Sequence, residues 1–142
     1  MSTEERANVF VGKCLCGCVS IRLRESKPSV GACHCSVCRK WGGGPFLSVE
    51  GHETPEIEGL EHVSVYASSE WAERGFCARC GSHLFYRLKS APFYAVSAGL
   101  FAESGNWPFK LQVFIDEKPA NYSFAERTKT MTGEEVFNAW QK

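Results

Sequence analysis

Two short stretches, Cys14-Leu-Cys16-Gly17 and Cys77-Ala-Arg-Cys80-Gly81, each combine two closely spaced cysteines with a glycine that follows the second one. Cysteines two or three residues apart can direct their sulfurs to one centre, and the glycine supplies the positive φ that a tight turn needs. Two such pairs deliver the four thiolates of a closed, tetrahedral zinc site. Spacing alone leaves open which clusters pair. We predict a structural zinc ion that joins two hairpins and is bound by Cys14, Cys16, Cys77 and Cys80.

A third cluster, Cys33-His34-Cys35-Ser36-Val37-Cys38, contains three cysteines within six residues, and no glycine directly follows the last one. Three thiolates on one short loop leave a fourth position of a zinc ion open, which is typical of catalytic rather than structural sites. Arg39 and Lys40 come next, and positive charge there favours thiolates and attracts an anionic ligand. The sequence predicts a catalytic zinc ion bound by Cys33, Cys35 and Cys38.

Other interpretations of the features around this cluster remain open. The cluster could hold a second structural zinc ion with a fourth ligand from elsewhere in the chain. His34 could complete the site, although a side chain between two ligands on an extended segment points to the opposite side. Residues 42–44, three glycines, form either a plain loop or a lip beside a substrate. Cys18 is expected to be a small residue on the polar side of a strand.

The composition of the 142 residues fits one domain, with 44% hydrophobic and 23% charged residues, enough to bury a core. Sixteen basic residues balance sixteen acidic ones, which argues against nucleic-acid binding. No run of apolar residues is long enough to span a membrane, and the polar segment 1–8 has no signal core. We therefore expect a cytoplasmic protein in a reducing compartment, where clustered cysteines bind metals rather than form disulfides.

Short runs of alternating, β-branched and aromatic residues predict a mainly β fold. At least seven strands are expected, at residues 9–11, 19–24, 45–49, 62–66, 83–86, 93–97 and 111–115. One short C-terminal helix is predicted, because Thr132 and Glu135 form a capping box. Val136, Phe137 and Trp140 then share one face of that helix. The cysteines are expected on short loops.

The order Cys14-x-Cys16-Gly17, Cys33-x-Cys35-x-x-Cys38-Arg39, Phe46 and Phe76-Cys77-x-x-Cys80-Gly81-Ser82 resembles the glutathione-dependent formaldehyde-activating enzyme (GFA) family, also called the centromere-protein-V domain. The segment Val113-Phe-Ile-Asp116-Glu-Lys-Pro119 is similar to the closing strand and turn of that family. The resemblance runs from about residue 9 to about residue 122. It implies a single GFA-like zinc domain over residues 1–142, with a C-terminal segment at 123–142. It also implies an Mss4-like fold, in which folded β-sheets of the β-tent type surround the zinc sites.

The resemblance also implies a function. The family's named activity is the condensation of glutathione with formaldehyde to S-(hydroxymethyl)glutathione, a carbon–sulfur lyase reaction. It implies up to two zinc ions per chain, a structural one at Cys14, Cys16, Cys77 and Cys80 and a catalytic one at Cys33, Cys35 and Cys38. The expected ligand is a small-molecule thiol or thiol adduct such as glutathione, and the residues that contact it are not evident from the sequence.

Three thiolates already donate to the second zinc ion, so it is a poor Lewis acid. We therefore expect it to activate a thiol rather than polarise an aldehyde. The alternative is a non-catalytic binding module, in which both zinc ions shape a surface for a protein partner.

Overall fold

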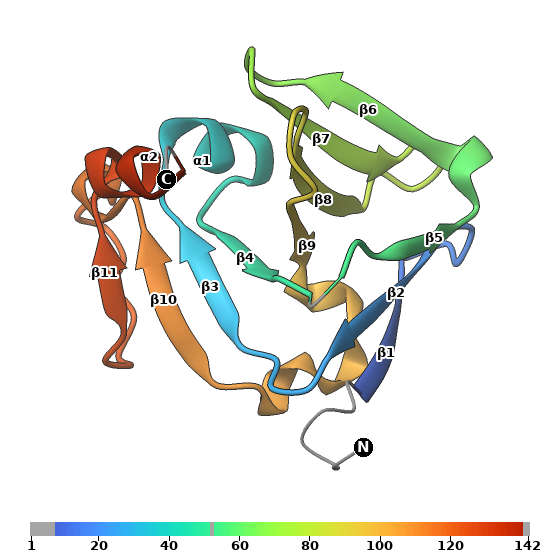
Figure 1. Ribbon diagram of the computed structural model, residues 1–142, viewed down its shortest axis with the longest axis horizontal. Helices are drawn as coiled ribbons and strands as arrows, with labels where there is room; N and C mark the ends of the chain where they lie inside the picture. Colours follow the sequence, from blue (N-terminus) through green and yellow to red (C-terminus); the bar gives the residue numbers. More distant parts are fainter. Residues whose placement is uncertain (1–7, 52, 141–142) are drawn as a thin grey trace.

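The computed structural model describes residues 8–51 and 53–140 and is mainly β (Figure 1). The ends of the expected domain, 1–7 and 141–142, lie outside the described residues. The strands are β1 (Asn8–Lys13), β2 (Ser20–Glu25), β3 (Val30–Cys33), β4 (Phe46–Val49), β5 (Glu56–Glu58), β6 (Val63–Ala67), β7 (Ala72–Cys77), β8 (His83–Leu88), β9 (Tyr94–Ser97), β10 (Phe109–Val113) and β11 (Lys129–Met131). The α-helices are α1 (Ser36–Gly42) and α2 (Gly133–Trp140), and the short 3-10 helices are η2 (Leu60–His62), η3 (Ala98–Leu100), η4 (Ala102–Asn106) and η5 (Ile115–Glu117).

These strands form two sheets. The smaller sheet has the order β1-β2-β5, and the larger has the order β11-β10-β3-β4-β9-β8-β7-β6. Strand β10 pairs in parallel with both β3 and β11, whereas the other neighbouring strands are antiparallel. In Figure 1 the strands from β11 to β4 run in a different direction from β6, β7 and β8, so the larger sheet is strongly bent. Strands β11 and β6 form the two edges of this bent sheet.

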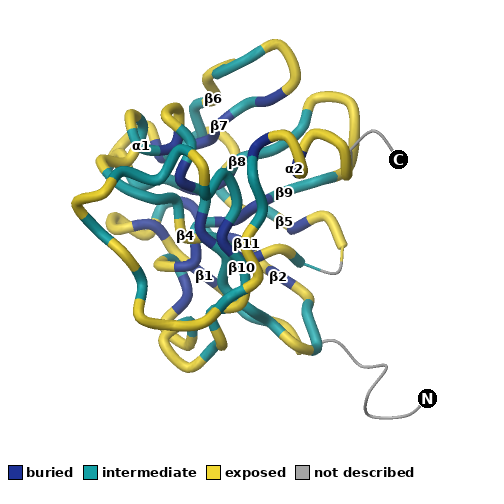
Figure 2. The backbone as a smooth tube through the Cα atoms, turned by 90° about the vertical axis from the view of Figure 1, so that its left-hand side faces the viewer, coloured by how far each residue is buried: buried dark blue, intermediate teal, exposed yellow. Residues whose placement is uncertain are grey.

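The core follows from the alternation of side chains along the strands. In β2, Ile21 and Leu23 are fully buried while Arg22 and Arg24 are exposed, as the period of two predicts. The buried residues lie mainly on strands of both sheets, whereas most loops are exposed or intermediate (Figure 2). The core cluster also contains two cysteines together with Val19, Val49, Leu84, Phe85, Val96 and Phe101.

The prediction of a mainly β fold is confirmed, and each of the seven expected strands overlaps an observed one. Strands β3, β5, β7 and β11 were not predicted. Strand β7 reads Ala-Glu-Arg-Gly-Phe-Cys, and its charged residues conceal the pattern because Arg74 is buried despite its charge. The predicted C-terminal helix is observed as α2, and a second helix that was not predicted, α1, contains Cys38.

The capping box of α2 is confirmed. The backbone N–H of Thr132 donates to Glu135 Oε1 at 2.9 Å, and the N–H of Glu135 donates to Thr132 Oγ1 at 3.2 Å. Val136 is buried and Phe137 is partly exposed, while the side chain of Trp140 lies outside the described part of the chain. None of the described helices is long and apolar enough to cross a membrane.

Candidate metal centres and pocket

The first centre lies where two hairpin turns meet. The turns are built alike: Gly17 N donates to Cys14 O at 3.0 Å, and Gly81 N donates to Cys77 O at 2.8 Å. Gly17 and Gly81 have φ of 80° and 78°, which confirms the predicted need for positive φ. The turns bring four sulfur atoms to within 4.8 Å of one another, those of Cys14, Cys16, Cys77 and Cys80.

The arrangement of these sulfurs fits a tetrahedral ion. The sulfur of Cys16 lies 3.7 Å from that of Cys14 and 3.7 Å from that of Cys77. Ligands that are about 2.3 Å from a zinc ion in tetrahedral geometry lie about 3.8 Å apart. Backbone N–H groups also donate to two of the sulfurs, from Val19 to Cys14 at 3.4 Å and from Cys80 to Cys77 at 3.5 Å. Such bonds stabilise thiolates, so the donor set is suited to a soft divalent metal.

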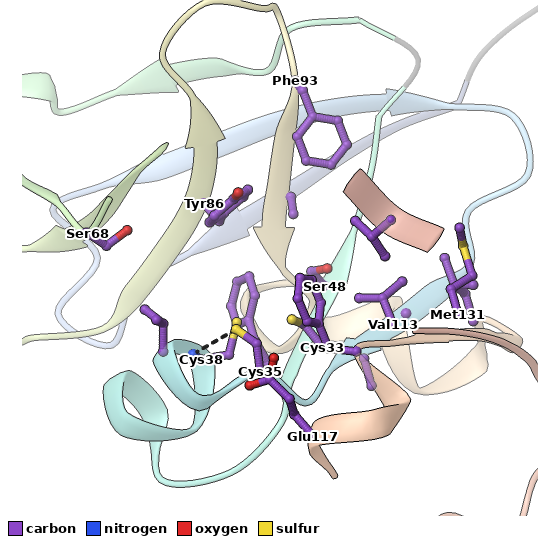
Figure 3. Close-up of a pocket in the computed structure, with 18 of the residues that line it drawn as sticks. Cys33, Cys35, Cys38, Ser48, Ser68, Tyr86, Phe93, Val113, Glu117 and Met131 are labelled. Carbon is purple, nitrogen blue, oxygen red and sulfur yellow. Dashed lines mark hydrogen bonds between the residues drawn. The ribbon is translucent and has the colours of Figure 1, made fainter. Parts of the chain in front are cut away.

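The second centre joins a strand to a helix. Cys33 ends β3, Cys35 is the N-cap of α1 and Cys38 lies inside that helix. The expectation that these three cysteines share a short loop was therefore wrong. Their sulfurs lie within 4.8 Å of one another, and Cys38 N donates to Cys35 Sγ at 3.3 Å (dashed in Figure 3). Hydrogen bonds from Cys33 and Cys38 hold the pKa of Cys35 well below its usual range. Three converging thiols of this kind suit a zinc ion with one position open.

His34 lies between two of these cysteines but does not join the cluster. It is fully buried, with Nδ1 2.8 Å from the Tyr122 hydroxyl and Nε2 2.8 Å from Gln112 Oε1. Gln112 uses its amide nitrogen to donate to Thr128, so its oxygen faces His34 and assigns the imidazole proton to Nε2. Burial lowers the pKa of His34. His34 therefore links the cysteine segment to the C-terminal part of the chain, on the side away from the sulfurs.

Arg74 is the residue of the second centre that the sequence analysis missed. It is 3% exposed, and its Nη1 and Nη2 donate to Cys38 Sγ at 3.5 and 3.4 Å. Its Nε donates to Ser68 Oγ at 3.2 Å, and its guanidinium carbon lies 5.0 and 5.1 Å from the ring centres of Trp41 and Tyr86. A buried cation is stabilised by an anionic partner, and the sulfur of Cys38 would be one as a metal-bound thiolate. An arginine inside a strand gives no sign of this role in the sequence.

Arg39 and Lys40, by contrast, do not line the pocket beside the sulfurs. Arg39 Nε donates to His34 O at 3.0 Å, and both residues line a separate hollow together with Pro119 and Asn121. The expectation that they would flank a ligand at Cys38 is therefore corrected, because the cation at that sulfur is Arg74. The helix turns them away, since successive residues of a helix lie on different faces.

Local geometry places two further features. Gly42 is the last residue of α1, and Gly43 caps the helix with φ of 83° and an N–H that donates to Arg39 O at 2.7 Å. Cys18 lies in the turn before β2 rather than on the strand, and it accepts a hydrogen bond from Arg79 Nη1 at 3.1 Å. Cys18 belongs to neither group of converging sulfurs found among the described residues.

A cavity of about 420 Å³ opens beside the second centre. Figure 3 shows Cys33, Cys35 and Cys38 on one side of it and Phe93 facing them from the opposite wall. Helix α2 closes part of the cavity with Val136, Phe137 and Ala139. The volume is in the range that holds small organic ligands. Three converging thiols at the wall of such a cavity are placed to act on a bound molecule.

Comparison with known proteins gives concordant results. A family model described as glutathione-dependent formaldehyde-activating enzyme matches residues 9–117. An uncharacterized lyase of Schizosaccharomyces pombe is 36% identical over 131 residues, which cover 92% of this chain and 96% of that protein. A Halomonas elongata protein, provisionally named a glutathione-dependent formaldehyde-activating enzyme, is 37% identical over 119 residues, with 76% of each chain covered.

A solved structure supports the fold independently. The crystal structure of a Rhodobacter sphaeroides protein matches this chain with a TM-score of 0.55 at 24% identity, covering 70% of this chain and 99% of that one. At this identity the match bears on the fold. The family model covers most of the chain, and the cysteine centres lie within the matched residues. The chain belongs to the glutathione-dependent formaldehyde-activating enzyme (GFA) family.

Proposed function

We propose that this protein is a zinc-dependent enzyme of the carbon–sulfur lyase type, which makes or breaks the bond between a thiol sulfur and a carbonyl-derived carbon. The formation of S-(hydroxymethyl)glutathione from glutathione and formaldehyde is one such reaction. The observation that carries the proposal is the group of three converging cysteines in the wall of a 420 Å³ cavity. Membership of the GFA family and the names of its relatives support the same class of reaction.

The metal ligands follow from the two groups of sulfurs. Cys14, Cys16, Cys77 and Cys80 would hold one zinc ion as part of the folded core, and Cys33, Cys35 and Cys38 would hold the other beside the cavity. When bound at the second centre, zinc supplies the acidity that converts a neighbouring thiol to a thiolate near neutral pH.

The residues of the chain have distinct roles in this reaction. Arg74 offsets the negative charge of Cys38, so that a further anionic sulfur is tolerated nearby. The cavity walls hold the thiol and the carbonyl compound together and keep bulk water away. A sulfur–carbon bond forms, the carbonyl π electrons move to the oxygen, and the proton lost by the thiol ends on that oxygen. The addition needs no other reactant.

The cavity also favours an enzyme over a non-catalytic binding module. Cys33 and Cys35 are half-buried and line the cavity, so they remain within reach of a small molecule. A centre that served folding alone would gain nothing from an adjoining cavity, because structural zinc sites are closed by four protein ligands.

The test compares two cysteine variants. Exchange between formaldehyde and its thiol adduct is measured by NMR, with glutathione and with 2-mercaptoethanol, for the wild type, Cys33→Ser and Cys18→Ser. We expect the wild type and Cys18→Ser to accelerate exchange with at least one thiol, since Cys18 lies outside both groups of sulfurs. Cys33→Ser should lose the acceleration and about one zinc ion per chain. Equal rates for Cys33→Ser and the wild type would contradict the proposal.

A further inference from the structure

The lining of the cavity beside the second centre is mostly aliphatic and aromatic. Phe93, Val113 and Met131 reach it from the segment before β9, from β10 and from β11 (Figure 3). Trp71, Phe46 and Leu111 extend the same apolar surface. Among the described residues that line the cavity, three side chains carry a formal charge at neutral pH apart from the cysteines: Glu50, Arg74 and Glu117.

The single cation in this set already has a partner. Arg74 donates to Cys38 Sγ from both terminal nitrogens and to Ser68 Oγ from Nε, and it is almost completely buried. Its ring contacts with Trp41 and Tyr86 fix its plane. A substrate carboxylate that took this guanidinium would have to displace its hydrogen bonds to Cys38 and Ser68, in a position with almost no access to water.

The two carboxylates act against an anionic ligand as well. Glu117 Oε1 accepts a hydrogen bond from Ser36 N at 2.9 Å, which places a negative charge at the start of α1. Desolvation in the concave wall and the neighbouring Glu25 raise the pKa of Glu50, although its side chain is exposed to solvent. A raised pKa shows that this wall disfavours negative charge. Glutathione carries two carboxylates, and the described lining offers neither of them a free cation.

We infer that the cavity accepts a thiol adduct whose organic groups are apolar and uncharged, such as the hemithioacetal of an alkyl thiol, in preference to a thiol that carries carboxylates. The inference rests on the proposed function, because the sulfur of the adduct is taken to lie at the second centre. Burial of apolar groups against this lining favours binding, whereas burial of an unpaired carboxylate opposes binding because the charge loses its hydration. The reaction remains the addition of S–H across C=O and needs no further reactant.

The experiment measures binding rather than activity. Zinc-loaded protein is titrated by calorimetry with hexane-1-thiol, 6-mercaptohexanoate, glutathione and hexyl methyl sulfide. The first two probes differ by one carboxylate at the end of the same chain. We expect hexane-1-thiol to bind at least about tenfold more tightly than 6-mercaptohexanoate and glutathione. Hexyl methyl sulfide should bind more weakly than hexane-1-thiol, because it cannot form a thiolate.

Paired variants locate the preference in the cavity. Phe93→Ser should weaken hexane-1-thiol binding by about fivefold or more, because it removes an aromatic wall. Tyr66→Ser is the control, since Tyr66 is 68% exposed and lies outside the cavity lining, and it should leave binding unchanged. Glu50→Gln should reduce the difference in affinity between hexane-1-thiol and 6-mercaptohexanoate. Glu103→Gln should leave it unchanged, because Glu103 is also exposed but lies outside the lining.

The outcomes separate this inference from the proposed function. Binding of glutathione or 6-mercaptohexanoate as tightly as hexane-1-thiol would overturn the apolar preference, even if the thiols still bind better than the thioether. Equal binding of hexane-1-thiol and hexyl methyl sulfide, with 6-mercaptohexanoate excluded, would support the apolar preference and contradict thiol activation. Absence of binding by all four probes would overturn both.

Discussion

Arg74 and Cys38 form a buried pair in which both terminal nitrogens of the guanidinium donate to one sulfur, at 3.5 and 3.4 Å. The two residues are 36 positions apart, on β7 and α1. The contact therefore fixes the helix that carries a cysteine of the second centre against the larger sheet. It also supplies the positive charge that a thiolate there requires.

The first prediction concerns this pair. Arg74→Met keeps the length of the stem but removes the charge and the donors, and it should lower the free energy of unfolding by about 3 kcal/mol. The stability of Arg74→Lys should lie between that of the wild type and that of Arg74→Met, because an ammonium group cannot donate from two nitrogens or stack on the rings in the same way. Urea unfolding measures both variants. The exposed Arg22→Met is the matched control and should change stability by less than about 0.5 kcal/mol. Equal losses at the two positions would contradict a special role for Arg74.

The second prediction concerns the two classes of metal site. Mild chelation should remove about one zinc ion per chain and leave about one, because four thiolates enclose an ion better than three. Cys77→Ser should damage folding, since Cys77 is fully buried in the core and metal binding contributes to the folding free energy. Cys33→Ser should stay folded and lose the weaker ion. Elemental analysis and circular dichroism give the result, and equal loss of structure in both variants would favour two structural ions.

The third prediction concerns the turns of the first centre. Gly17→Ala and Gly81→Ala should each lower the free energy of unfolding by about 1–2 kcal/mol, because φ values of 80° and 78° are unfavourable for a residue with a Cβ. At both positions the added Cβ would have no atom within 4 Å, so the loss of stability would come from backbone strain and not from a steric clash. Gly105 also has free space but lies outside the left-handed region, and Gly105→Ala should change stability by less than about 1 kcal/mol. Unfolding curves at saturating zinc provide the comparison.

The fourth prediction concerns pH. The raised pKa of Glu50 means that the folded chain holds the proton of this carboxyl more tightly than the unfolded chain does. The resulting stabilisation is fully present below the ordinary value of 4.5 and is lost as the pH rises through the raised folded pKa. Glu50→Gln stays neutral at every pH, so it should be more stable than the wild type at neutral pH. The difference in the free energy of unfolding between Glu50→Gln and the wild type should narrow as the pH falls from about 8 to about 5. A difference that does not change with pH would contradict desolvation of this carboxyl as its cause.

The cysteine pattern predicted the centres because turn geometry is local. Gly17 and Gly81 follow their cysteines directly, so the need for positive φ could be inferred from a few residues. The overlap of all seven expected strands has the same origin, since alternation such as that of Ile21 and Leu23 is visible in a short window. Zinc binding itself remains a prediction.

Long-range features could not be inferred in this way. The burial of Arg74 depends on Cys38, Trp41 and Tyr86, which meet it only in the folded chain. Helix α1 escaped prediction because its seven residues are too few for a periodic pattern and a cysteine occupies its N-cap. The cavity combines β-strands with α2 from the far end of the described chain, so its apolar lining has no signal in any single segment.

The distance along the chain between the two halves of the first centre has a consequence for synthesis. Cys16 and Cys77 are 61 residues apart, so translation at about 5–20 residues per second separates their appearance by roughly 3–12 s. During that interval the first hairpin presents two thiols without the other two. Its nascent turn is then open to oxidation or to capture of a wrong metal, until the second hairpin leaves the ribosome and closes the site.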